Sequence, residues 1–136
     1  MGRVWALLLL LYCALIFYLS SQPMLPVPDI FSMQDKLIHA AAYALMAAFF
    51  WQAGRSYGRQ KPVVTINQLA VMGVIFSALY GAGDEWHQSF VAGRDASFFD
   101  FLADLFGALL LTLTLWRREA VAIEREQKLN GVVENH

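Results

Sequence analysis

Four apolar stretches of membrane-spanning length occupy most of this 136-residue chain, at about residues 4–20, 35–53, 66–83 and 97–116. An α-helix needs about 20 apolar residues to cross the hydrocarbon core of a bilayer. Because each backbone polar group there must be bonded within its own segment, such stretches fold as helices. The sequence predicts an all-α integral membrane bundle of four transmembrane helices in residues 1–118. Arg117 and Arg118 are expected to end the fourth transmembrane helix, and residues 119–136 to form a short cytoplasmic tail that is helical at first and frayed after Asn130-Gly131.

Composition supports a membrane protein. The chain is 58% hydrophobic and 15% charged, with a positive mean hydropathy of +0.47, against about 45–50% and 25% in soluble domains. Its formal net charge of -1, without a clustered basic surface, argues against nucleic-acid binding. The first apolar stretch is either a signal peptide or a retained helix. We expect a retained helix, because Leu19-Ser20-Ser21 is a poor small-x-small cleavage site.

Basic residues predict the orientation of the bundle. With four spans, eight of the ten Lys and Arg side chains fall on one side: Arg3, Arg55, Arg59, Lys61, Arg117, Arg118, Arg125 and Lys128. By the positive-inside rule this side faces the cytoplasm, so both termini are expected there. All aspartates then lie toward the outer side: Asp29, Asp35, Asp84, Asp95, Asp100 and Asp104.

The third stretch carries a stripe of small residues. Gly73, Ser77 and Gly81 follow one another at four-residue spacing, which places them on one helix face and lets a neighbouring helix approach closely. Close packing is the simplest interpretation of this stripe.

A group of ionisable residues follows the third stretch. The ionisable side chains of Asp84, Glu85 and Arg94, together with the neutral amide of Gln88, stand between two segments apolar enough for a bilayer. A charge at membrane depth costs roughly 2.5–3.5 kcal/mol on insertion scales, so these groups need partners, water or a ligand. On a helix, Asp84 and Gln88 share one stripe and Glu85 lies on an adjacent one.

Two further pairs recur at helical spacing on neighbouring spans. Asp35 and His39 are four residues apart, with Tyr43 one turn deeper, and Asp100 and Asp104 repeat the spacing. The second helix starts, the third ends and the fourth starts on the outer side of the membrane. The polar ends of three helices are therefore expected to converge at one level.

Each of these residues also has a structural interpretation. Asp35 and Asp100 can serve as charges at helix amino ends, Lys36 can extend to the headgroups, and His39 can be a neutral interhelical hydrogen-bonder. Asp104 is harder to explain in this way, because it lies a full turn below the helix start. It is protonated, pairs with Arg94 or His39, or holds a cation.

Taken together, four short motifs resemble the VanZ-like family: Asp35-Lys36-x-x-His39, Asp84-Glu85-x-x-Gln88, Gly93-Arg94, and Asp100-x-x-x-Asp104 with Gly107. These are small four-helix membrane proteins named for a glycopeptide-resistance accessory protein. The resemblance covers about residues 29 to 111 and implies a bacterial inner-membrane protein, the founding member being linked to teicoplanin resistance. Asp104 departs from the pattern, since such proteins often carry Asn there; the added charge favours a cation or proton role.

Three functions are compatible with these residues. In the first, an outward-facing pocket binds or modifies an envelope lipid or lipid-linked sugar, with Arg94 and Lys36 holding a phosphate. In the second, a metal-dependent enzyme holds a hydrated cation between the acids and uses His39 as general acid or base. In the third, the polar network only locks together the helices of a structural or assembly protein. The first accounts best for the position at the outer leaflet.

The candidate residues form two sets. Those expected to carry chemistry are Asp35, His39, Glu85, Asp100 and Asp104, and those expected to contact a ligand are Arg94, Gln88, Asp84, Lys36 and Tyr43. Oxygen-rich ligands favour magnesium, manganese or calcium, whereas His39 or His87 would admit zinc. The sequence names no reaction, cofactor or oligomeric state. The expected partner is a membrane lipid or a lipid-linked envelope precursor.

Overall fold

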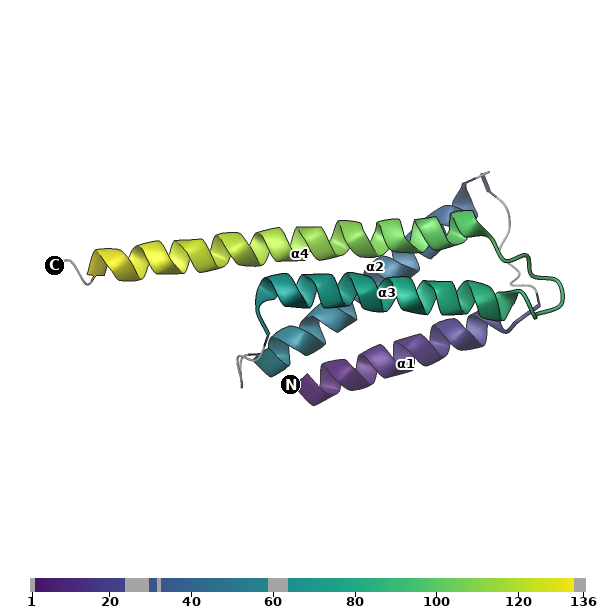
Figure 1. Ribbon diagram of the computed structural model, residues 1–136, viewed down its shortest axis with the longest axis horizontal. Helices are drawn as coiled ribbons and strands as arrows, with labels where there is room; N and C mark the ends of the chain where they lie inside the picture. Colours follow the sequence, from purple (N-terminus) through teal and green to yellow (C-terminus); the bar gives the residue numbers. More distant parts are fainter. Residues whose placement is uncertain (1, 24–29, 32, 59–63, 134–136) are drawn as a thin grey trace.

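The computed structural model is a bundle of four α-helices (Figure 1): α1 (Gly2–Ser20), α2 (Gln34–Gly58), α3 (Ile66–Gln88) and α4 (Phe98–Val133). The structure describes residues 2–23, 30–31, 33–58 and 64–133, and this part of the chain contains no strand. All four helices are long and apolar enough to cross a membrane. The predicted all-α bundle of four transmembrane helices is confirmed.

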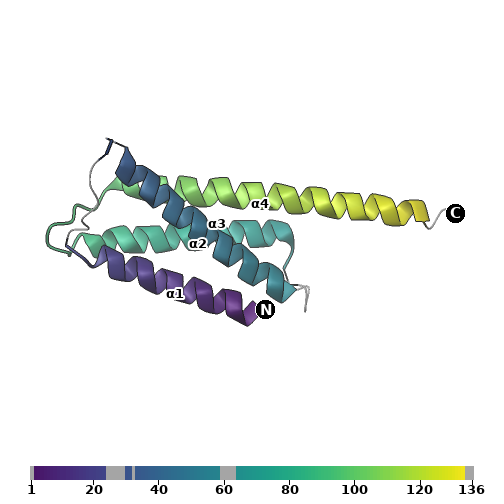
Figure 2. The same ribbon diagram turned by 180° about the vertical axis from the view of Figure 1, so that it is seen from behind.

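Successive helices run in opposite directions, so their ends collect at two levels (Figures 1 and 2). At one level α1 and α3 end while α2 and α4 begin; we call this the polar end. The most extensive helix contact joins α2 and α4; α3 packs mainly on α4, and α1 packs mainly on α2 and touches α3 only slightly. The α2–α4 pair is thus the centre of the bundle, and α3 and α1 pack against it.

The close α2–α4 approach depends on a glycine. A Cβ atom added at Gly107 would lie 1.9 Å from the backbone oxygen of Ala40, so no larger residue fits without moving a helix. The predicted small-residue stripe of α3 is confirmed as a packing surface, since Gly73, Ser77 and Gly81 are all buried.

Helices α2, α3 and α4 extend beyond the apolar stretches of the sequence, α3 by the turn that ends at Gln88. α2 continues to Gly58, and α4 passes through Arg117 and Arg118 without a break to Val133, so the arginines do not end the helix, and the helical start expected for residues 119–136 is a continuation of α4. The loss of apolar character marks where a helix can leave the membrane, but Arg, Glu, Gln and Lys are good helix formers. Asp29, Arg59 and Lys61, which enter the orientation argument, lie outside the described residues.

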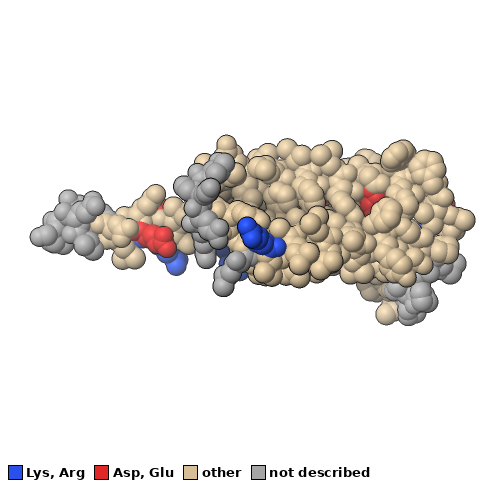
Figure 3. Space-filling model, turned by 90° about the horizontal axis from the view of Figure 1, so that it is seen from below, with Lys and Arg blue, Asp and Glu red and all other residues tan. Residues whose placement is uncertain are grey.

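The outer surface of the bundle is apolar. In the view of Figure 3, Lys, Arg, Asp and Glu are nearly absent from the body of the bundle. Around the polar end the exposed side chains include Trp86, Phe90, Phe98 and Phe99. Aromatic residues are enriched where a membrane meets water, so these side chains suit an interfacial position.

Candidate functional site

Polar side chains from three helices are buried together at the polar end. We define the acid–histidine cluster as His39 of α2, Asp84 and Glu85 of α3, and Asp100 and Asp104 of α4. All four acids are buried. The predicted convergence of three polar helix ends is therefore confirmed for these residues.

The innermost pair of the cluster joins α2 to α4. His39 Nδ1 lies 2.9 Å from Asp104 Oδ1, and Asp104 is only 1% exposed. Of the partners expected for Asp104, the structure provides His39. Tyr43, the predicted neighbour one turn deeper, is also buried, but its hydroxyl has no hydrogen-bond partner among the described residues.

Lys36 bridges the outer edge of the cluster. Its ammonium group donates to Asp35 Oδ2 at 2.8 Å and also to Asp100 Oδ1 on α4. Asp35 and Asp100 both stand in the first turn of their helices, where a negative charge suits the helix dipole. Both acids thus stand where a charge at a helix amino end was expected, and Asp100 in addition forms an ion pair between α4 and α2 with Lys36.

Two acids at the end of α3 each accept one hydrogen bond from a nearby segment of the chain. Glu85 Oε2 accepts the backbone N–H of Ser97 at 2.7 Å, just before α4 begins. Asp84 Oδ2 accepts from the Gln88 side-chain amide at 3.1 Å, one helical turn away. Glu85 therefore ties the end of α3 to the start of α4, whereas Asp84 and Gln88 pair within α3.

Three buried carboxylates keep one oxygen unpartnered. Asp84 Oδ1, Glu85 Oε1 and Asp104 Oδ2 have no hydrogen-bond partner within the part of the chain that the structure describes. An unmet buried acceptor costs about 1–3 kcal/mol, and more if it is charged. The cluster is therefore built to receive something further at these oxygens: a proton, water, a cation or a polar ligand.

Arg94 lies apart from the cluster. Its Nε donates to the Gln22 carbonyl at 2.9 Å and its Nη2 to the Leu19 carbonyl at 3.0 Å, and it forms no ion pair with a described acid. Nearby, His87 stacks on Phe17 and bonds Ser21 Oγ at 3.0 Å. Both side chains thus anchor the end of α1, contrary to the expectation that Arg94 joins the acids. Backbone acceptors occur at every residue, so no sequence signal marks these partners.

A shallow pocket between α3 and α4, the lateral pocket, borders the cluster. It encloses about 410 Å³ and is lined in part by Glu85, Trp86, Ser97, Phe98 and Phe101. The sequence did not predict it, because the pocket needs two helices at a particular rotation. Glu85 belongs both to this pocket and to the buried cluster.

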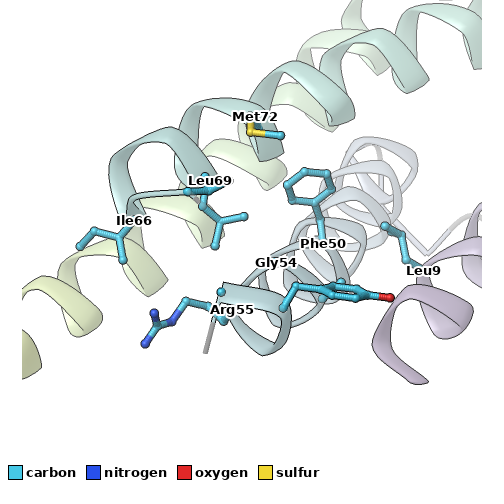
Figure 4. A pocket seen from close by; sticks show the side chains of 11 residues that line it. Leu9, Phe50, Gly54, Arg55, Ile66, Leu69 and Met72 are labelled. Carbon is cyan, nitrogen blue, oxygen red and sulfur yellow. The ribbon is translucent and has the colours of Figure 1, made fainter. Parts of the chain in front are cut away.

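A larger pocket of about 560 Å³ lies at the opposite end of the bundle (Figure 4). Phe50, Leu69 and Met72 surround Gly54 there, with Arg55 at the edge. Arg55 pairs with Glu119 of α4. None of the predicted site residues lines this apolar pocket.

Among the residues that the structure describes, two sets of three side chains could hold a metal ion. In each, one ligand atom per residue lies within 4.8 Å of the others: Asp35, His39 and Asp100 form the first, and His39, Glu85 and Asp104 the second. The first already contains the ammonium group of Lys36. The second consists only of buried or half-buried side chains.

Comparisons with known proteins add a distant relative. No family model matches the chain, and no solved structure is similar to it. An uncharacterized protein of Schizosaccharomyces pombe is 32% identical in an alignment 113 residues long that covers 79% of this chain and 63% of that protein. The chain thus spans less than two thirds of its relative's length. This similarity carries no activity with it, so the function has to be argued from the acid–histidine cluster.

Proposed function

We propose that this membrane protein binds or modifies the polar headgroup of an envelope lipid or lipid-linked sugar. The observation that supports the proposal is that Glu85 belongs both to the buried acid–histidine cluster and to the lining of the lateral pocket. A headgroup entering from the lipid side would meet Glu85 first. The other groups of the cluster lie behind it.

The lining of the lateral pocket suits such a ligand. Trp86, Phe98 and Phe101 offer apolar faces for an acyl chain or a sugar ring, and Ser89 and Ser97 add small polar groups. Ligand sites commonly combine aromatic walls with a few polar groups that fix orientation. Among the residues that line the pocket, Glu85 carries the charge, and it is negative. A headgroup with hydroxyl groups, which can donate hydrogen bonds to this carboxylate, therefore fits the wall better than a bare phosphate.

Lys36 replaces Arg94 as the proposed phosphate contact. Arg94 is held by carbonyl groups of the α1 end, whereas Lys36 is half-buried at the cluster edge. A phosphate could exchange with the exposed Asp35 carboxylate as one partner of the Lys36 ammonium group. His39, oriented by Asp104, would serve as general acid or base if the headgroup is modified.

The VanZ-like resemblance sets the wider context of the proposal. It supports a bacterial inner-membrane location and an effect on glycopeptide susceptibility, teicoplanin above all, and the positive-inside rule supports a cytoplasmic position for both termini. The polar end would then face the outer leaflet, where lipid-linked envelope precursors are presented. Changed teicoplanin susceptibility on expression of the chain would support this part.

Lipid retention tests the proposal directly. The full chain, purified in a mild detergent and analysed by native mass spectrometry, is expected to retain envelope lipid. Glu85→Gln removes the charge at the pocket wall and should lower the retained fraction at least several-fold. Asp95→Asn, an exposed residue outside the cluster, is the matched control and should behave as wild type. Equal lipid retention by wild type and a folded Glu85→Gln protein would overturn the proposal.

A further inference from the structure

The second candidate triad brings one ligand from each of three helices. His39 comes from α2, Glu85 from α3 and Asp104 from α4, with their ligand atoms all within 4.8 Å of one another. A cation bonded at about 2.0–2.4 Å holds its ligand atoms roughly 3–4.5 Å apart. A small inward movement of these side chains is therefore enough to enclose a single ion.

Each carboxylate of this triad has one anchored and one unpartnered oxygen. Asp104 Oδ1 lies on His39 Nδ1, and Glu85 Oε2 accepts from the Ser97 backbone. Asp104 Oδ2 and Glu85 Oε1 have no partner among the described residues, although both side chains are more than nine-tenths buried. Glu85 is thus oriented as ligating carboxylates typically are, by an outer hydrogen bond on one oxygen, whereas the Asp104–His39 contact joins two of the proposed ligands and would be replaced by their bonds to the ion.

The charge of the deep cluster also calls for a cation. Asp84 and Glu85 form no ion pair within the described part of the chain, and Asp104 has only the His39 imidazole. A bound divalent ion would offset this excess of carboxylates. The Asp35 side of the cluster differs, because the Lys36 ammonium group already lies between Asp35 and Asp100.

We propose that His39, Glu85 and Asp104 bind one divalent transition-metal ion, such as Mn²⁺ or Zn²⁺. Two carboxylates and one imidazole suit these ions, whereas Mg²⁺ and Ca²⁺ prefer oxygen alone. Asp84, whose second buried oxygen is also unpartnered, adds a further buried carboxylate at this end of the bundle but is not a member of the proposed ligand set. Metal binding goes beyond the headgroup function and does not depend on it; His39 is a ligand when the ion is bound and is available for acid–base chemistry only in the metal-free site.

Direct titration of the purified full chain tests the metal site. Protein stripped with a chelator is titrated with Mn²⁺, followed by electron paramagnetic resonance, and with Co²⁺ as a spectroscopic substitute for Zn²⁺. We expect one ion per chain and a thermal unfolding midpoint that rises with metal concentration. Glu85→Gln should weaken binding about 100-fold, and His39→Gln should abolish the Co²⁺ absorption bands that nitrogen ligation produces.

Two control variants separate this triad from the other one. Asp35→Asn and Asp95→Asn should bind metal as wild type does, because neither residue belongs to the proposed ligand set. Metal affinity unchanged in Glu85→Gln, affinity lost in Asp35→Asn, or no binding to wild type at millimolar metal would each overturn the inference. Lipid retention measured in the presence of the chelator tests the headgroup proposal separately, so either proposal can fail alone.

Discussion

Asp104 has the most constrained chemistry of any residue in the cluster. It is 1% exposed, touches His39 through one oxygen and leaves the other unpartnered. A Cβ at Gly81 would come within 3.3 Å of that free oxygen, so α3 covers the carboxylate closely. A neutral Asp104 would donate a proton to a neighbour, whereas a charged one requires a positive partner.

Asp104→Asn distinguishes these two states. The amide keeps an oxygen for His39 but loses the charge, so we expect a loss of about 1–3 kcal/mol in the free energy of unfolding. Thermal or chemical unfolding in detergent measures this change, with Asp95→Asn as the control. Unaltered melting with and without divalent ions, together with unaltered lipid retention, would show that Asp104 is a neutral hydrogen-bonder.

Arg94 acts on the first helix. Its guanidinium group contacts two carbonyls near the end of α1, those of Leu19 and Gln22. Lysine cannot span both acceptors with the same fork. The role of Arg94 is therefore to hold the connection after α3 against α1.

Arg94→Lys is expected to loosen α1 and leave the cluster intact. We expect a loss of about 1 kcal/mol in stability and faster amide hydrogen exchange at the end of α1. Metal and lipid binding should stay within twofold of wild type. A variant that lost lipid binding while α1 exchange was unchanged would instead restore a phosphate role for Arg94.

Among the helices, the close crossing of α2 and α4 requires a glycine at position 107. The position of Gly107 against the Ala40 carbonyl lets the two backbones touch. His39 and Asp104 lie close to this crossing in sequence, so the contact also sets the separation of the innermost pair.

Gly107→Ala should therefore destabilise the bundle and disturb the cluster. An added methyl group must push the helices apart, at a cost of about 1–3 kcal/mol or more. Gly83→Ala is the matched control, because a Cβ at Gly83 meets nothing within 4 Å. Unfolding in a denaturing detergent series compares the two. Equal stability of both variants would mean that α2 and α4 are farther apart than described.

At the scale of the whole molecule, the long helix α4 makes the two ends of the bundle different. It continues past the other helices on the side opposite the polar end (Figure 1). Its extension carries a Lys128–Glu124 pair one turn apart, which supports a solvated helix. Basic residues gather toward this side, which agrees with a cytoplasmic location by the positive-inside rule.

Cysteine labelling tests this orientation. In a Cys13→Ser background, Ser56→Cys and Gln127→Cys should be protected from an impermeant thiol reagent in intact cells, whereas Asp95→Cys should react. Ser56 and Gln127 lie on α2 and α4 beyond the apolar core, and Asp95 is exposed at the polar end. Reaction of either cytoplasmic-side cysteine from outside would reverse or break the predicted topology.

The four helices and the level of the polar residues follow from local properties of the chain. A helix of known rise crosses a bilayer of known thickness, and spacing of four residues places Asp35 near His39 and Asp100 near Asp104 whatever surrounds them. The start of α3 was also predictable, because Thr65 and Gln68 form a capping box at its amino end. These features depend only on residues that are close to one another in the sequence.

The partners of the ionisable groups depend instead on how the helices rotate against one another. His39 takes Asp104, Lys36 takes Asp100, and Arg94 takes carbonyl groups of α1. Side-chain identity cannot predict such a choice, because several acids were equally available and backbone carbonyls are the same at every residue. Helix packing, through contacts such as that of Gly107 with Ala40, brought one set of partners within bonding distance, left one oxygen each of Glu85 and Asp104 without a partner among the described residues, and placed His39, Glu85 and Asp104 close together.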